Sequence, residues 1–396
     1  MVYYFNEDME SVETIVSVLK VCSKYFSVPT IIDDPKLKQK IAYLNNLKSV
    51  WSNNQIEDCV YPSEVYKQIC VMFSENVFRS LPVSCYSGED EINNEMMWEF
   101  HQLSPVYSVF NAFLDLKGFD PEKASQYIDK KFINASIRRL DSCVEAEREW
   151  IKHILLRLLQ VAPYLRDFIY HGVVNTLAEY GYVQINEFKG VKELLEILKS
   201  YITCKLIVPA VLVKVLPPLM KRNGLVHYIL TLNECFELAV RQIDANLSVA
   251  FVEYTLAHWP AAGMPLYLPW CRMLFAICQS CGEAQWTQVR QRTVQHLAQL
   301  LRNDNFVVCD ATIEFCGRLV DENRLDSVQA QTVAEALAVV YTNHWNYNCV
   351  VEAGHMLKRL VDNQYLLDGP SRVKVMQVLI EERPHKMVQQ MIDDTV

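Results

Sequence analysis

Glycine is scarce in this sequence, with 11 residues out of 396. Sandwiches and barrels made of many short strands depend on glycine-rich turns, so this scarcity argues against those folds. An excess of basic residues is also missing, because the formal net charge is −9. A nucleic-acid-binding domain typically gathers Lys and Arg on one basic face. The composition therefore argues against nucleic acid as a partner and favours other proteins.

Signals for export or membrane insertion are missing too. Residues 1–8, MVYYFNED, lack the basic start and the long apolar core of a secretory signal. The longest apolar run, residues 201–220, is interrupted by Lys205, Lys214 and prolines, whereas a spanning helix needs about 20 apolar residues. We therefore predict no membrane span. The 13 cysteines are scattered along the chain, so we expect free thiols in a reducing compartment.

Motifs that carry catalysis are missing as well. The sequence holds no G-x-G-x-x-G, no Walker loop, no H-E-x-x-H and no G-x-S-x-G. Cys278 and Cys281 form CQSC, but no second pair follows at the spacing of a zinc site. A packed helical pair is favoured there over a metal or redox site. The sequence thus predicts no enzyme, no catalytic residue, no metal site and no cofactor.

Residues 344–349, HWNYNC, place His, Asn and Cys side chains close together in sequence. A nucleophilic triad needs convergence in space, and adjacency at the start of one helix does not give that geometry. We interpret Asn346 as a helix N-cap and Trp345 as a staple against the previous repeat.

Helical apolar periodicity is what the sequence has in abundance. Within residues 154–209, two apolar stripes are separated by a turn near Gly181. The stripes consist of Leu155, Leu158, Leu159, Ala162 and Leu165, then Leu194, Leu195, Ile197 and Leu198. A helical hairpin of this kind cannot bury both faces alone, so it needs neighbours in a stack.

Candidate helices recur along the whole chain, about eighteen in all, near the roughly 40-residue period of HEAT-type helix pairs. No Gly/Ser tract or low-complexity block separates them. We therefore predict an all-α fold, a HEAT-like α-solenoid of about eight to nine stacked helical hairpins. It should form a single domain over residues 1–396.

Several sequence blocks, taken in order, resemble one protein family across essentially the whole chain. They are YPSEVY at Tyr61, VFRSLP at Val77, YIDKKF at Tyr127, ELLEIL at Glu193, LVKVLPPL at Leu212, AHWP at Ala257 and NHWN at Asn343. The family is the B-prime family of regulatory subunits of protein phosphatase 2A. ELLEIL alone is weak, because leucine–glutamate helices are common, but the ordered set is specific.

The resemblance implies a regulatory subunit that joins a phosphatase scaffold subunit and a phosphatase catalytic subunit. It also implies that substrate proteins are recruited through L-x-x-I-x-E-like segments, and that the protein is cytoplasmic and nuclear. A generic helical-repeat adaptor that lacks phosphatase association is the alternative, since fold does not settle function. An enzyme is a distant third reading.

By the same resemblance, the peptide-binding groove falls within residues 154–209. The matching positions are Leu156, Arg157, Leu159 and Arg166 on the first helix, then Glu196, Ile197 and Tyr201 on the second. The family has His and Tyr where this chain has Leu156 and Leu159, an isoleucine at Tyr201, and a longer basic loop afterwards.

Two readings of the arginines remain open. Arg157 and Arg166 suit the glutamate of such a segment through charge-assisted hydrogen bonds. Alternatively, they pair with Glu196 or another acidic residue of the stack, as exposed arginines commonly do.

Overall fold

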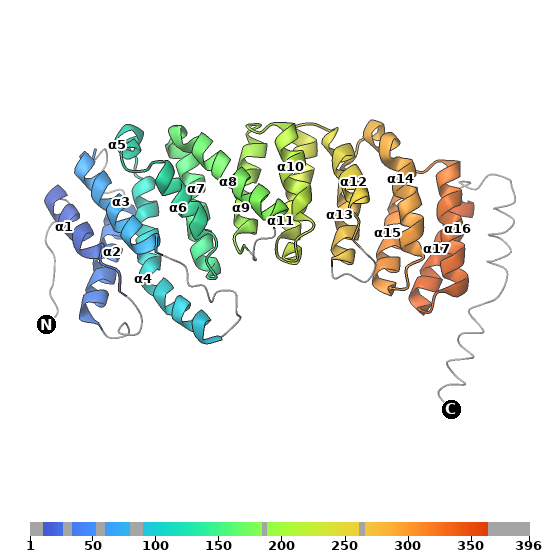
Figure 1. Ribbon diagram of the computed structural model, residues 1–396, viewed down its shortest axis with the longest axis horizontal. Helices are drawn as coiled ribbons and strands as arrows, with labels where there is room; N and C mark the ends of the chain where they lie inside the picture. The colour runs from blue at the N-terminus through green and yellow to red at the C-terminus, as the bar shows by residue number, and fades with distance from the viewer. Residues whose placement is uncertain are drawn as a thin grey trace, which may run out of the picture. The chain divides into compact units, whose positions relative to one another are not determined.

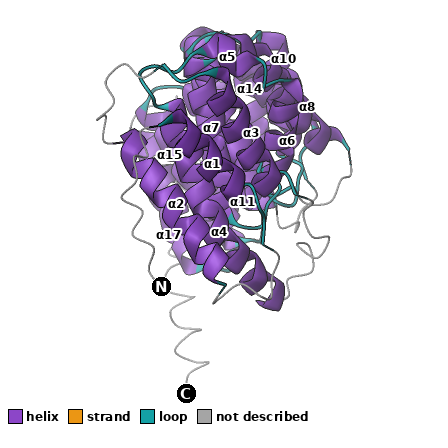
Figure 2. Cartoon of the chain, turned by 90° about the vertical axis from the view of Figure 1, so that its left-hand side faces the viewer, coloured by secondary structure: helices purple, strands orange, loops and turns teal. Residues whose placement is uncertain are grey.

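The computed structural model describes residues 11–26, 34–52, 60–79, 90–183, 188–260 and 266–362, and the side chains of all these except 90–99. Helices account for nearly all of this part of the chain, and the described ranges contain no strand (Figure 2). The prediction of an all-α solenoid is confirmed. None of the described helices is both long and apolar enough to cross a membrane.

The chain divides into two compact units, Met1–Leu206 and Ile207–Val396. The first unit contains α1 Val12–Cys22, α2 Pro35–Ser52, α3 Ser63–Val77, α4 Asp90–Leu114, α5 Pro121–Ser125, α6 Lys130–Arg139, α7 Glu145–Val161, a short 3-10 turn Pro163–Leu165, α8 Arg166–Tyr182 and α9 Val191–Thr203. The second contains α10 Pro209–Leu219, α11 Leu225–Gln242, α12 Leu247–Ala257, α13 Tyr267–Ser280, α14 Glu283–Leu301, α15 Phe306–Asp321, α16 Ser327–Asn343 and α17 Tyr347–Asp362.

Helices in the first unit pack as successive hairpins: α1 with α2, α3 with α4, α6 with α7, and α8 with α9 (Figure 1). The second helices of these hairpins also pack on one another, in the order α2, α4, α7 and α9. This arrangement buries both faces of a hairpin that could not be stable alone. It places α7 between α4 and α9.

The second unit repeats the scheme with α10 and α11, α12 and α13, α14 and α15, and α16 and α17. Here α10, α12, α14 and α16 form one row, and α11, α13, α15 and α17 form the other. Among the described residues, the four hairpins of each unit give eight, in agreement with the predicted eight to nine. The single domain over 1–396 stays a prediction.

The predicted hairpin at residues 154–209 needs a correction. Its first stripe does not run on as one helix, because α7 ends at Val161 and α8 begins at Arg166 after the turn at Pro163. Proline lacks the N–H of the helical ladder and disfavours helical backbone in the residue before it. Ala162 accordingly has φ −129° and ψ 74°. The first stripe therefore belongs to the α6–α7 hairpin, and the second to α8–α9.

The apolar stripes form the core around the candidate site. Leu155, Leu158, Ala162 and Leu165 are fully buried, whereas Leu159 lies at the edge of the first stripe and is half-buried. All four members of the second stripe on α9 are fully buried.

Candidate functional site

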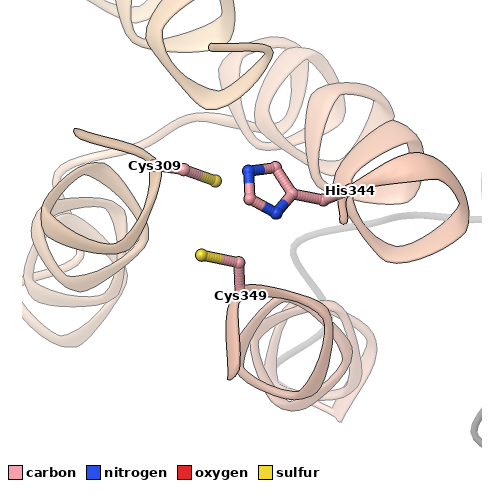
Figure 3. Close-up of side chains that lie close together, drawn as sticks. All are labelled: Cys309, His344 and Cys349. Carbon is pink, nitrogen blue, oxygen red and sulfur yellow. The ribbon is translucent and has the colours of Figure 1, made fainter. Parts of the chain in front are cut away.

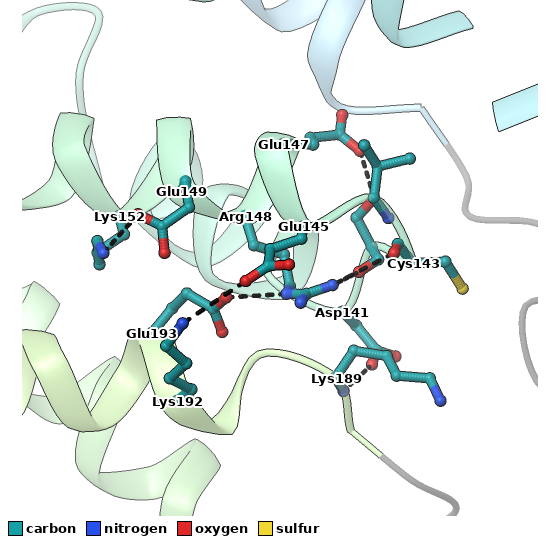
Figure 4. A network of polar contacts seen from close by, with 12 residues as sticks. Asp141, Cys143, Glu145, Glu147, Arg148, Glu149, Lys152, Lys189, Lys192 and Glu193 are labelled. Atoms are coloured by element: carbon teal, nitrogen blue, oxygen red, sulfur yellow. Dashed lines mark hydrogen bonds and ion pairs between the residues drawn. The ribbon is translucent and has the colours of Figure 1, made fainter. Parts of the chain in front are cut away.

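A row of ion pairs joins α7 to α9 at the beginning of both helices (Figure 4). Arg148 Nε of α7 lies 2.9 Å from Oε1 of Glu193, which is fully buried on α9. One turn later, Lys152 pairs with Glu196 of α9 and, at 2.7 Å, with Glu149 of its own helix. These contacts fix which face of α7 is turned toward α9.

A second charged group anchors the first turn of α7. Glu147 is fully buried, and its carboxylate accepts hydrogen bonds from Arg139, Arg79 and Tyr107 at 3.1, 3.2 and 2.8 Å, respectively. Burial by itself raises the pKa of Glu147, but the two guanidinium groups outweigh that effect and hold it below its ordinary value. The buried carboxylate is therefore ionised and fully partnered, so it locks α7 to α6 and α4.

Leu156 and Leu159 lie one and two turns beyond Lys152, on the face of α7 that is turned to α9. Both are half-buried, whereas Ile197 and Tyr201 of α9 are buried at 0% and 4% exposure. The Tyr201 hydroxyl donates a 2.7 Å hydrogen bond to the Arg166 carbonyl oxygen, and its ring packs against Tyr170. Ile197 and Tyr201 are thus buried on α9, whereas Leu156 and Leu159 are partly accessible on α7.

The two predicted arginines lie in different surroundings. Arg166 is exposed at the start of α8, and its Nε donates a 3.2 Å hydrogen bond to the Leu159 carbonyl oxygen. Arg157 Nε lies 2.7 Å from Oδ1 of Asp115, which directly follows α4. The structure therefore brings Leu159, Arg166 and Tyr201 together and turns Arg157 toward the neighbouring hairpin.

Sequence reasoning missed two charged residues at this site. Lys152 is the cation that pairs with Glu196, a role that the sequence analysis considered only for the arginines. The spacing of Glu149 and Lys152 on one helix face was the available signal, but it could not identify the partner on α9. Asp115 gave no signal at all, because it is brought beside Arg157 only by the packing of α4 on α7.

The chemistry of this surface suits an extended peptide with apolar and acidic side chains. The half-buried leucines offer apolar contact, and Arg166 can donate bidentate hydrogen bonds to a carboxylate. Arg157 and Asp115 are 33% and 50% exposed, so their pair is weak and an incoming carboxylate can compete for the arginine.

Comparison with known proteins gives consistent matches. Residues 6–373 match the family described as "Protein phosphatase 2A regulatory B subunit (B56 family)". The serine/threonine-protein phosphatase 2A 56 kDa regulatory subunit alpha isoform of Mus musculus is 28% identical over 368 residues, covering 89% of this chain and 74% of its own length. The delta isoform of Oryctolagus cuniculus is 27% identical over 379 residues, covering 91% of this chain and 63% of its own.

Proposed function

Because this chain belongs to the B56 family of protein phosphatase 2A regulatory B subunits, we propose that it joins a phosphatase scaffold subunit to a catalytic subunit and recruits substrates through L-x-x-I-x-E-like segments. Its role in the phosphatase is regulatory, and the catalysis would come from the partner subunit. We place the complex in the cytoplasm and the nucleus.

The peptide site in this proposal is the surface formed by the ends of α7 and α9. The observation that carries it is the grouping of Leu159, Arg166 and Tyr201, held by the hydrogen bonds at Arg166. A leucine and an isoleucine of the segment would contact the half-buried Leu156 and Leu159. Its glutamate would bind Arg166, with Arg157 as a second receptor.

A peptide titration tests the site. A labelled L-x-x-I-x-E peptide is titrated against the wild type, Arg157→Ala and Arg166→Ala by fluorescence polarisation. Charge-assisted hydrogen bonds contribute about 1.5–3 kcal/mol, so loss of Arg166 should weaken binding at least about tenfold. Arg241→Ala is the matched control, since that arginine is exposed and pairs with Glu237 on a helix of the other unit. Equal binding by the wild type and both arginine variants, or by none of them, overturns the proposed site.

Subunit association needs a separate test. Affinity purification of the full chain from native extract should recover a scaffold subunit and a phosphatase catalytic subunit. Their absence would favour the adaptor without phosphatase association. The residues Leu156, Leu159 and Tyr201 favour this second candidate, because they differ from the family's residues at these positions.

A further inference from the structure

Three side chains with metal-binding chemistry converge where α15 and α17 begin and α16 ends (Figure 3). Cys309 lies in the first turns of α15, Cys349 lies in the first turn of α17, and His344 directly follows α16. Their ligand atoms all lie within 4.8 Å of one another. Among the described residues, this is the one such group of three. In the described part of the chain, Cys278 and Cys281 of the CQSC segment belong to no such group of three.

The imidazole of His344 is held in place by its neighbours. Trp345 stacks beside it, and the indole Nε1 donates a 2.8 Å hydrogen bond to the Asp304 carbonyl oxygen just before α15. Asn346 caps α17, as the sequence predicts, because its Oδ1 accepts the N–H groups of Asn348 and Cys349. Both contacts fix the short connection that carries His344 against the thiols.

One polar atom of this cluster has no hydrogen bond. The Cys309 and Cys349 thiols lie 3.4 and 3.6 Å from the carbonyl oxygens of Leu301 and Phe306. Nδ1 of His344 accepts the Asn346 N–H at 3.1 Å, whereas Nε2 is buried and makes no hydrogen bond. A buried polar atom without a partner is uncommon and calls for an explanation such as an ion.

The metal itself would have to stabilise the thiolates. Burial raises the pKa of both Cys309 and Cys349, whereas a bound metal ion deprotonates a coordinating thiol. Zinc binds thiolates at about 2.3 Å and imidazole at about 2.0–2.1 Å, so tetrahedral ligand atoms lie about 3.5–3.8 Å apart. Small side-chain movements would bring a cluster that spans no more than 4.8 Å to that separation.

We propose that Cys309, His344 and Cys349 form a zinc site that clips α15, the α16–α17 connection and α17 together. Binding releases two protons, because each thiol becomes a thiolate and the neutral imidazole keeps its one proton. Coordination through Nε2 requires that proton to lie on Nδ1, so the contact from the Asn346 N–H is lost. Three protein ligands leave a fourth position for a water molecule.

Metal titration of the full chain under a non-thiol reductant tests the site. The stripped wild type should take up one equivalent of Zn²⁺ against a chromophoric chelator. Co²⁺ in its place should give a thiolate-to-cobalt charge-transfer band and the visible spectrum of a tetrahedral site. Zn²⁺ should also raise the melting temperature of the wild type, because it binds only the folded arrangement.

Variants assign the ligands. His344→Ala and Cys349→Ala should each weaken Zn²⁺ binding by more than the roughly 10–100-fold that loss of an outer partner costs. Cys204→Ala, which removes an exposed thiol of the other unit, and Cys278→Ala should bind as the wild type does. His344 is half-exposed, so its variant should fold, and melting without metal verifies this.

Several results would overturn the zinc site. The first is that the wild type retains no Zn²⁺, or that its Co²⁺ complex lacks the thiolate band. This measurement uses the wild type alone. Another is equal retention of Zn²⁺ by the wild type and His344→Ala. A wild type that takes up no metal yet links Cys309 to Cys349 on oxidation would show a redox pair instead.

Discussion

Lys152 of α7 forms an ion pair with Glu196 of α9, and this contact sets the register between the two helices of the proposed peptide site. The Lys152 side chain is only 9% exposed and also bonds Glu149. Burial lowers the pKa of Lys152, but the two carboxylates outweigh that effect and raise it above its ordinary value of 10.5. The lysine is therefore charged and held by two ion pairs. It supports the proposed peptide site by joining α7 to α9.

Lys152→Met should lower the free energy of unfolding by about 1.5–3 kcal/mol, the contribution of hydrogen bonds to charged groups. Because the folded pKa is raised, this stabilisation is complete below pH 10.5 and is lost as the pH rises through the folded value. Urea unfolding at neutral and alkaline pH measures both effects. Lys67→Met on the exposed face of α3 is the control, and equal losses in the two variants would contradict the assignment.

Glu147→Gln should be among the most destabilising isosteric changes in the first unit. It leaves the buried Arg139 without its counter-charge, which typically costs about 3–5 kcal/mol. The folded pKa of Glu147 is lowered, so its contribution is present above the ordinary value of 4.5 and is lost as the pH falls through the folded value.

Denaturation of the wild type and Glu147→Gln at several pH values checks this expectation. The difference between them should be largest near neutrality and shrink in acid. Glu122→Gln, at an exposed position of α5, should change stability little. A difference that does not depend on pH would mean that Glu147 acts through packing alone.

Gly190→Ala should destabilise the start of α9. An added Cβ would lie 2.4 Å from the backbone oxygen of Leu140 and 2.7 Å from its Cβ, so the backbone after α6 must shift. Overpacking of this kind typically costs about 1–3 kcal/mol. The matched control is Gly282→Ala, whose Cβ would meet only the end of the flexible Gln285 side chain at 2.9 Å. Thermal melting compares the two, and similar stability would refute the close contact.

Asp115→Asn should strengthen peptide binding at the proposed site. It releases Arg157 from a half-exposed pair worth about 0.2–1 kcal/mol, so the affinity for an L-x-x-I-x-E peptide should rise about 1.5–5-fold. Glu237→Gln breaks a comparable exposed pair with Arg241 and should have no effect. Weaker binding by Asp115→Asn would show that Asp115 holds Arg157 in the orientation that binds.

The order of helices was largely readable from the sequence, but their pairing near the site was not. Prolines and apolar spacing act locally, so most helix positions followed from them. Pro163 is the exception, since the stripe through Leu158, Ala162 and Leu165 keeps its spacing although the helix ends at Val161. An apolar pattern records which residues are buried, and a turn with suitable geometry can preserve it.

The candidate site was predicted residue by residue, and its electrostatics were not. Leu156, Leu159, Arg166, Ile197 and Tyr201 were placed by their match to the family. The partner of Arg157, by contrast, could be any acidic residue of the stack until packing selected Asp115. Similarly, the closeness of His344 and Cys349 in sequence could not indicate a three-ligand cluster, because its third member is Cys309 on α15.

The sequence by itself determined that this protein is a stack of amphipathic helical hairpins of a phosphatase regulatory family. Helix formation and burial periodicity depend on near neighbours in the chain, so the local sequence determines them. Only the tertiary structure decided that Lys152 pairs with Glu196, that Arg157 faces Asp115, and that two thiols meet one imidazole. Charge pairs and metal ligands require side chains from distant segments to come within a few ångströms, and only the packing of the hairpins sets those distances.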